Sequence, residues 1–290
     1  MATPALARFG SDERKREFLA PTLAGDLVCS IAVSEPGAGS DVAGIRTRAV
    51  RDGDDWVING RKMWITSGTQ SDWVCLLART SDEGGYQGMS MIVVPTSTPG
   101  FSVGRKLKKM GNNSSDTAEL VLDDVRVPVR YTIGEEGRGF QMQMAQFQDE
   151  RLWICYMAVT GARRAIDRTK EYLHMREAFG KPLIANQYIQ YTLSELVADI
   201  DILHGFLHHT AARYVAGEDV TRAATVAKLQ SGRLSRKVAD ACVQFHGGMG
   251  YAEDLWVARY FRDCRLGSIG GGADEVMLRI PPDARVVEGK

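Results

Sequence analysis

This sequence has few cysteines, no excess of charge of one sign and no long hydrophobic run. The five cysteines are scattered, odd in number and form no Cys-x-x-Cys pair, which argues against a disulfide framework or a zinc site and favours a reducing compartment. Lys plus Arg and Asp plus Glu both total 36, so the overall charge does not favour nucleic acid or an anionic membrane as a partner. No run approaches the roughly 18 apolar residues of a membrane span.

The composition is that of a globular protein. Apolar residues make up 44% and charged residues 25% of the 290 residues, enough to build one large or two ordinary domains. Charges interrupt the first residues where a signal peptide would need its apolar stretch. We therefore expect a cytoplasmic protein with no bound metal and no membrane span.

After a short helical segment at 12–19, residues 27–130 have the pattern of β-strands. Short runs rich in apolar and β-branched residues alternate with Gly, Pro, Asn and Asp, at 27–34, 56–59, 62–66, 73–79, 90–95 and 118–122. Asn59-Gly60 predicts a type I′ hairpin turn, because both central residues of that turn need positive φ. We expect a small antiparallel barrel or sandwich here.

From Arg138 onward the apolar spacing becomes helical. The pattern predicts helices at 138–176, 186–215 and 219–245, a shorter one near 252–260 and another that starts near Ala273. Short joints between long helices favour an antiparallel bundle over 131–290, and Ile280-Pro281-Pro282 predicts a helix break after Arg279. The expected fold class is α+β: an antiparallel β-barrel-like domain followed by a C-terminal antiparallel helical bundle.

Two segments of the β region could hold a planar ligand. The loop Ser34–Asp41 offers small residues and free N–H groups that can approach a ring or a phosphate closely. In the strand Lys62–Thr66, alternation puts Trp64 and Thr66 on one face, where an indole beside a hydroxyl suits a heteroaromatic ring. A plain turn and a core tryptophan are the alternatives.

Five ordered motifs together resemble the acyl-CoA dehydrogenase family, over roughly residues 7–279. They are Val33-Ser-Glu-Pro-Gly-Ala-Gly-Ser-Asp41, Ile58-Asn-Gly-Arg-Lys-Met-Trp-Ile-Thr66, Phe179-Gly-Lys-Pro-Leu183 with Gln187, Gln244-Phe-His-Gly-Gly-Met-Gly-Tyr251 and Arg262-Asp-Cys-Arg265. The resemblance implies FAD as cofactor and an acyl-CoA substrate. It also implies that residues 1–26 are the remnant of a longer N-terminal helical domain that this chain lacks, followed by a β domain at 27–130 and the bundle at 131–290.

The resemblance assigns cofactor-binding residues in both regions. The flavin ring would lie against the 31–40 loop and the 64–66 strand, through Ile31, Val33, Ser34, Ser40, Trp64, Ile65 and Thr66. The pyrophosphate and adenosine of a neighbouring subunit's FAD would meet Arg176, Phe179, Gln187, Gln244, Gly247 and Gly248, and Ala273 and Glu275 would also lie at the FAD. A homodimer or homotetramer is implied. Ala273 stands where a hydroxyl is usual.

The catalytic base is expected on a helix. Many relatives carry it in the loop after the Arg262–Arg265 motif, where this chain has Gly271. Relatives that act on long or branched acyl chains resemble this sequence in placing a Glu before an Arg on a helix, here Glu150 and Arg151. Apolar neighbours at helical spacing should raise the pKa of Glu150, unless Glu150 is a structural partner of an arginine.

The remaining site residues follow from the same resemblance. The Gly271 N–H would meet the thioester carbonyl as an oxyanion-type contact, with Ser40 and Gly272 beside the substrate. Arg151 would position the substrate or the loop, or else form an interhelical ion pair. His204 and His208 lie one helical turn apart but lack a third ligand, the basic run Gly104–Met110 is expected to be a solvated loop, and His246 should pack near the FAD loop.

The sequence thus predicts an FAD-dependent acyl-CoA dehydrogenase of fatty acid β-oxidation. Glycines at 270–272 leave room near the reacting carbons, which favours long, branched or isoprenoid acyl chains. The product would be the trans-2-enoyl-CoA, with electrons passing to an electron-transfer flavoprotein. An acyl-CoA oxidase-like enzyme and a non-catalytic fragment that binds CoA or oligomerises are the alternatives.

Overall fold

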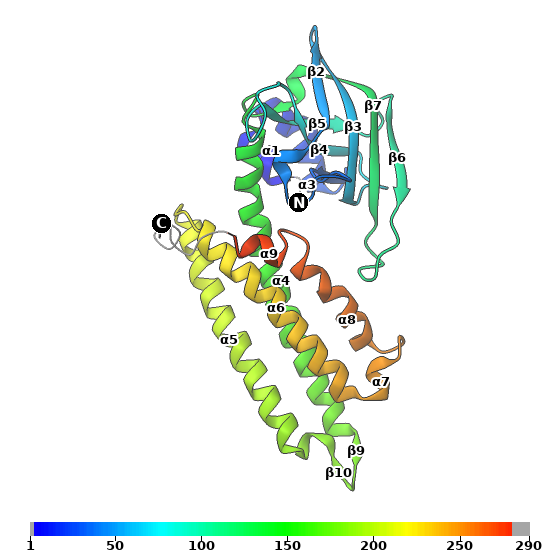
Figure 1. Ribbon diagram of the computed structural model, residues 1–290, viewed down its shortest axis with the longest axis vertical. Coiled ribbons are helices and arrows are strands. Elements are labelled where there is room, and N and C mark those ends of the chain that lie inside the picture. The colour runs from blue at the N-terminus through cyan, green and yellow to red at the C-terminus, as the bar shows by residue number, and fades with distance from the viewer. Residues whose placement is uncertain (1–2, 280–290) are drawn as a thin grey trace, which may run out of the picture. The chain divides into compact units, whose positions relative to one another are not determined.

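A computed structural model describes residues 3–279 of the chain. These residues form two compact units: a β unit of residues 3–109 and 113–147, and a helical unit of residues 110–112 and 148–279 (Figure 1). The helix break predicted at 280–282 lies outside the described residues. The domain limits at 26 and 130 stay a prediction.

The β unit begins with short helices and continues as a sheet. The helices are α1 (Thr3–Phe9), α2 (Asp12–Arg14), a π-helical turn (Lys15–Leu19) and α3 (Ala20–Ala24). The strands are β1 (Cys29–Ala32), β2 (Arg48–Asp52), β3 (Asp55–Thr66), β4 (Trp73–Arg79), β5 (Met89–Pro95), β6 (Phe101–Lys106), β7 (Thr117–Pro128) and β8 (Thr132–Ile133). Strands β2, β6 and the short β8 were not predicted.

The sheet is mixed and open, so the expected antiparallel barrel is wrong. Its order is β6-β7-β3-β2-β4-β5-β8, and β1 also pairs with β4. Both β1 and β2 run parallel to β4. Parallel pairing needs a long connection, which the chain between β1 and β4 provides. Within the described residues β6 and β8 end the sheet, and no pairing closes it.

The hairpin predicted at Asn59-Gly60 is also wrong. Strand β3 continues through both residues, and the turn before it lies at Gly53, since Asp52 pairs with Asp55. A register shift in the β3–β7 pairing occurs between Ile58 and Gly60. A Cβ on Gly60 would lie 2.4 Å from Thr47 Oγ1. Glycine is needed here for a close tertiary approach.

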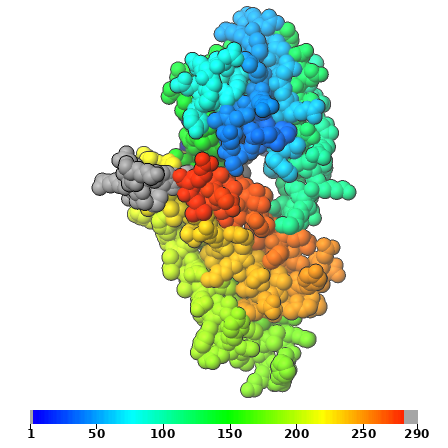
Figure 2. All heavy atoms as spheres, viewed as in Figure 1, coloured from blue at the N-terminus to red at the C-terminus, as the bar shows by residue number. Residues whose placement is uncertain are grey.

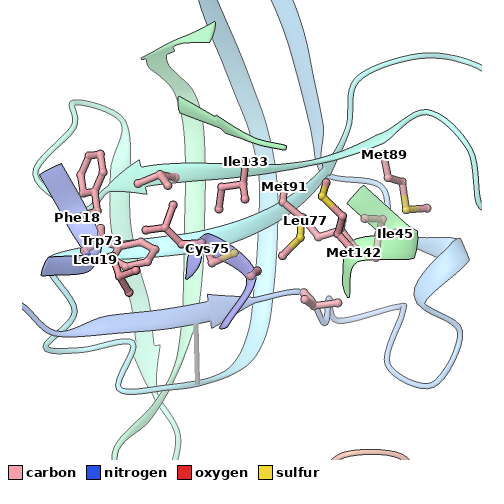
Figure 3. Close-up of a cluster of buried hydrophobic side chains, with 14 of the residues drawn as sticks. Phe18, Leu19, Ile45, Trp73, Cys75, Leu77, Met89, Met91, Ile133 and Met142 are labelled. Carbon is pink, nitrogen blue, oxygen red and sulfur yellow. The ribbon is translucent and has the colours of Figure 1, made fainter. Parts of the chain in front are cut away.

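Two buried layers hold the β unit together. Strands β4 and β5 are buried along nearly their whole length, as expected of strands covered on both faces. On one face the helices of residues 3–24 cover a cluster that includes Phe18, Trp73 and Met91 (Figure 3). On the other face Trp56 is buried, and its indole N–H donates to Thr132 Oγ1 at 2.9 Å. Each such large side chain contributes about 1.5–3 kcal/mol by burial.

The helical unit confirms the predicted long helices. They are α4 (Gly139–Met175, in this unit from residue 148), α5 (Gln187–Val215) and α6 (Thr221–His246), followed by α7 (Gly248–Tyr251), α8 (Trp256–Cys264), a 3-10 turn (Arg265–Ser268) and α9 (Asp274–Met277). A small hairpin of β9 (Glu177–Ala178) and β10 (Lys181–Pro182) joins α4 to α5 through a 3-10 turn (Leu183–Ala185). Figure 1 shows the three long helices side by side. No helix among residues 3–279 is long and apolar enough to cross a membrane.

A close crossing fixes the segment that follows α8. A Cβ on Gly232 of α6 would lie 2.8 Å from Gly267 O, so only glycine lets α6 and the 3-10 turn approach this closely. In Figure 2 the segment that runs from this turn to Arg279, orange-red to red, lies at the surface. The loop Gly270–Gly272 is thereby held against α6.

Candidate active site

A buried ion pair connects the 33–40 loop to β3 in the β unit. Lys62 Nζ donates to Glu35 Oε1 and to Val33 O, both at 2.9 Å, and its side chain is 0% exposed. Glu35 also accepts the N–H groups of Arg46 and Thr47, at 2.7 and 2.9 Å. The loop backbone is therefore tied to β3 by a buried, hydrogen-bonded ion pair.

The ionisation of this pair follows from its surroundings. Burial lowers the pKa of Lys62 to about 8, against the attraction of the Glu35 carboxylate. Burial also disfavours the charge on Glu35, but Lys62 and the N–H donors outweigh it and lower the pKa of Glu35. Both groups are therefore charged at neutral pH.

The predicted flavin residues of the β unit differ in what they expose. Trp64 is 63% exposed and Thr66 is exposed, whereas Ile65 between them is buried. In the loop, Val33 is buried and Ser40 is exposed. Ile31 and Ser34 are half-buried. The β unit thus offers a ligand the Trp64 indole, the Thr66 and Ser40 hydroxyls and exposed loop backbone. Val33 and Ile65 can reach a ligand only through backbone atoms.

Trp64 has an unusual backbone conformation. Its φ is +66°, at a register shift in the β3–β7 pairing between Lys62 and Ile65. The Met63 N–H donates to Ser34 O at 2.8 Å, which ties this bulge to the loop. A bulky residue in the left-handed region costs free energy and is typical of functional sites.

Glu150 lies in the helical unit, on α4, and is 7% exposed. The apolar stripe predicted around it is only partly buried, since Trp153 and Met157 are 54% and 57% exposed. Ile154, one turn after Glu150 on the same face, is half-buried. Burial lowers the pKa of the neighbouring Arg151, and the negative charge of Glu150 opposes this effect.

The loop Gly270–Gly272 lies over the same turn of α4. Arg151 Nε donates to Gly271 O at 3.4 Å, and a Cβ on Gly271 would lie 2.8 Å from Ile154 Cδ1. Gly271 has a φ of +67°, so a side chain at 271 would be strained as well as crowded. The structure therefore places the Gly271 loop against Arg151 and Ile154, on the turn of α4 that also carries Glu150.

Lys228 on α6 also contacts the loop. Its Nζ donates to Gly272 O and lies 4.0 Å from Asp274 Oδ1, and Asp274 also pairs with Arg236 at 3.1 Å. The predicted cofactor residues Ala273 and Glu275 flank this carboxylate, half-buried and exposed respectively.

A second group of predicted residues lies at the other end of α6. Arg176, Gln244, Gly247 and Gly248 line a hollow of about 720 Å³, together with Tyr172, Tyr188 and His246. Lys228 and Gln244 are sixteen residues apart on α6, which corresponds to roughly 24 Å along the axis. The site residues of the helical unit therefore form two separate groups.

Phe179 and Gln187 are near this end of the bundle but do not line the hollow. Phe179 is fully exposed at the tip of the β9–β10 hairpin, with a φ of +54°. Gln187 is exposed, and its Nε2 donates to the Tyr191 hydroxyl.

His246 is a buried group of the hollow whose second nitrogen has no partner among residues 3–279. Its Nδ1 lies 2.7 Å from Cys242 O, and its ring stacks on Tyr172. Burial lowers the pKa of His246, so the neutral ring donates from Nδ1 and leaves Nε2 as an unpaired acceptor. Such an atom is consistent with a polar ligand or water in the hollow.

The sequence did not predict the two buried lysines, Lys62 and Lys228, or the acids that neutralise them, Glu35 and Asp274.

His204 and His208 contact each other and Tyr156 edge to face, and the described residues contain no group of three side chains that could hold a metal. The basic run at 104–110 is partly strand, because β6 extends to Lys106.

Most of the sequence matches two domains of a known protein family. Residues 30–125 match the family described as acyl-CoA dehydrogenase, middle domain, and residues 137–282 match acyl-CoA dehydrogenase, C-terminal domain. The chain belongs to the acyl-CoA dehydrogenase family. This family is FAD-dependent.

Relatives within the acyl-CoA dehydrogenase family are longer than this chain. The long-chain specific acyl-CoA dehydrogenase of Sus scrofa is 39% identical over 96% of the chain, which spans 65% of that relative. The cyclohexane-1-carbonyl-CoA dehydrogenase of Syntrophus aciditrophicus is 41% identical over 84% of the chain and 64% of its own length. A probable acyl-CoA dehydrogenase from Mycobacterium abscessus has a similar structure, with a TM-score of 0.94, 44% identity and coverage of 96% of this chain and 74% of that one.

Proposed function

We propose that this chain carries the flavin site and the catalytic base of an acyl-CoA dehydrogenase that converts an acyl-CoA to its trans-2-enoyl-CoA. The observation that carries the proposal is the position of Glu150, a buried carboxylate on the helical turn that also contacts the Gly271 loop. A general base needs a dry pocket that tunes its pKa and a nearby group that stabilises the charge formed.

The residues of the chain divide the chemistry between them. Glu150 takes the proton from Cα, and the electron pair of that bond moves toward the thioester carbonyl. The Gly271 N–H donates to the carbonyl oxygen as negative charge develops there. The ring site of the β unit would hold FAD, which would supply the acceptor for the hydride that leaves Cβ. One proton and one hydride leave the substrate, and the Cα–Cβ double bond forms.

The donor set of the β unit fits the ring of FAD. Trp64 and Thr66 are exposed beside a loop whose backbone is held by the Lys62–Glu35 pair. Exposed indole surface, hydroxyls and free backbone N–H groups suit an isoalloxazine with polar edges. We assign Ile31, Val33, Ser34, Ser40, Trp64, Ile65 and Thr66 to this ring site, with Ser40 also beside the pantetheine arm.

The hollow at the end of the bundle suits a diphosphate and an adenosine. Arg176 supplies a guanidinium for a pyrophosphate, and Tyr188 and His246 supply aromatic and polar surface. Because this group lies far along α6 from the Gly270–Gly272 loop, we assign Arg176, Phe179, Gln187, Gln244, Gly247 and Gly248 to the FAD of a neighbouring subunit. A homodimer or homotetramer follows, and a cytoplasmic location stays a prediction of the sequence.

The substrate proposed is a long, branched or isoprenoid acyl-CoA. Gly271 carries no side chain and lies directly against Ile154 Cδ1, and relatives about 40% identical are named for long-chain and cyclohexane-1-carbonyl substrates. A panel of acyl-CoAs of graded length and branching tests this assignment. A sharp preference for short straight chains would refute it.

The deciding experiment is anaerobic addition of acyl-CoAs to the purified protein, with flavin absorbance as the readout. We expect bleaching with wild type and its loss in Glu150→Gln. Glu171→Gln, an exposed carboxyl on the same helix, is the matched control and should bleach as wild type does. Bleaching at full rate in Glu150→Gln would remove Glu150 from its role.

Two alternatives have distinct outcomes in the same preparation. An electron-transfer flavoprotein is the proposed acceptor, whereas peroxide production in air would indicate an acyl-CoA oxidase-like enzyme. A protein without flavin absorbance bands would indicate a non-catalytic CoA-binding or oligomerising fragment.

A further inference from the structure

Lys228 is a buried cation that the proposed chemistry does not use. Its side chain is 0% exposed, and a buried ammonium is costly unless it is paired and hydrogen-bonded. Its two partners are Gly272 O and the Asp274 carboxylate. Burial lowers the pKa of Lys228, and the negative charge of Asp274 opposes this effect. Both partners belong to the segment that carries the Gly270–Gly272 loop.

The surroundings of Lys228 on α6 are built from small residues. Ala224, Ser231 and Gly232 lie one turn away from it and are all buried. Gly232 permits the close approach of the 3-10 turn before the loop. The helix thus leaves space for the lysine stem while the ammonium reaches the loop carbonyl.

The loop needs such a tether. Gly271 and Gly272 have φ values of +67° and +111°, and glycine has no strong preference for any one of the conformations open to it. Two cations hold its carbonyls: Arg151 donates to Gly271 O, and Lys228 to Gly272 O. The Gly271 N–H makes no hydrogen bond to any acceptor among residues 3–279, so it remains available to a ligand.

We propose that Lys228 is a positioning residue, which with Arg151 holds the loop so that the Gly271 N–H faces the thioester oxygen of the substrate. This inference rests on the proposed function and extends it to a residue that touches neither substrate nor cofactor. When Glu150 removes the Cα proton, the electron pair of the C–H bond delocalises onto the thioester oxygen. A loop without its tether would leave that oxygen with a poorly aligned donor.

The test separates proton removal from oxidation. An acyl-CoA with sulfur in place of Cβ has no hydride to lose at that position, so Cα–H exchange in D2O reports only the reversible proton transfer to Glu150. The holoenzyme is incubated with this compound and exchange is followed by mass spectrometry. The kcat and KM for an oxidisable acyl-CoA and the FAD content are measured on the same preparations.

Lys228→Met keeps most of the length of the side chain and removes the charge. Lys237→Met, at an exposed lysine of α6, is the matched control. We expect Lys228→Met to slow both the Cα–H exchange and kcat by about 10-fold or more. This loss should be smaller than the roughly 100- to 1,000-fold loss that follows removal of an oxyanion donor itself. The KM and the FAD content should change little, because the interaction acts on the transition state. Lys228→Gln, which keeps a donor, should recover part of the loss, and it carries the test if the Met variant does not fold.

Three outcomes would overturn the inference. They are wild-type exchange in both Lys228 variants, a loss confined to KM or FAD content, and an equal loss in Lys237→Met. If the wild-type protein shows neither flavin bleaching nor Cα–H exchange, the proposed function is refuted, and this inference with it.

Discussion

Replacing Glu35 by glutamine should destabilise the β unit more than replacing its partner Lys62 by methionine. In Glu35→Gln the Lys62 ammonium stays 0% exposed but loses its counter-charge. Breaking a buried pair in this way costs about 3–5 kcal/mol. The lysine can reduce this cost by giving up its proton, because burial has already lowered its pKa from 10.5 to about 8.

Lys62→Met should cost less, about 1–3 kcal/mol. The Glu35 carboxylate would keep the N–H groups of Arg46 and Thr47 as donors, and a methionine stem would fill much of the same volume. The double variant, Glu35→Gln with Lys62→Met, should be more stable than Glu35→Gln alone, since it removes the unpaired charge. The double-mutant cycle therefore gives the coupling energy of the pair.

Urea unfolding at pH 7, followed by tryptophan fluorescence, measures these differences, because Trp56 and Trp73 are buried in the β unit. The pKa of Glu35 is lowered from 4.5, so its contribution is complete above pH 4.5 and is lost as the pH falls through the lowered value. The gap between wild type and Glu35→Gln should therefore narrow in acid. A Glu35→Gln cost below about 1 kcal/mol, or a larger cost for Lys62→Met, would refute the reasoning.

Three further outcomes follow from the backbone and from burial. Gly60→Ala should cost about 1–3 kcal/mol in urea unfolding by overpacking, whereas Gly37→Ala, which meets nothing within 4 Å, should not; equal midpoints would contradict this. Gly271→Ala should slow flavin bleaching, measured by stopped-flow absorbance, more than Gly270→Ala. A Cβ at 271 would lie 2.8 Å from Ile154 Cδ1, whereas a Cβ at 270 would lie 3.5 Å from Leu266 Cδ1. Thiol labelling with mass spectrometry should modify the half-buried Cys29 and Cys264 first, while the three buried cysteines stay unlabelled until the protein unfolds.

The helices were predictable because their signal is local. A 3.6-residue apolar period over some thirty residues needs no knowledge of the partner, and α4, α5 and α6 end within a few residues of the predicted limits. Strands β2 and β6 lacked any such signal. Most of their residues are exposed and polar, so they are strands only because β3 and β7 lie beside them. The turn predicted at Gly60 was wrong for the same reason, because glycine is needed there to let Thr47 lie close to the backbone of β3 in the folded chain.

The candidate site was predictable where exposure follows from alternation, as for Trp64 and Thr66. It was not predictable where charge is buried. A lysine in a sequence is expected to be solvated, and nothing local distinguishes Lys62 from its exposed neighbour Arg61. For Lys228 the run of small residues around it was the one available signal, because only small neighbours leave room for a buried lysine stem. The acids that neutralise these lysines are distant in sequence, so the pairing is a property of the fold.

The tip of the β9–β10 hairpin illustrates a conflict between folding and recognition. A left-handed backbone costs an L-residue about 1–2 kcal/mol, and Phe179 adopts it with its ring entirely in water, so the lone chain gains nothing from this choice. Glycine would fold more cheaply at the same place. If Phe179 contacts the FAD of a neighbouring subunit, as proposed above, its ring would be covered only in the assembled protein, and the hairpin would trade intrinsic stability for an anchor.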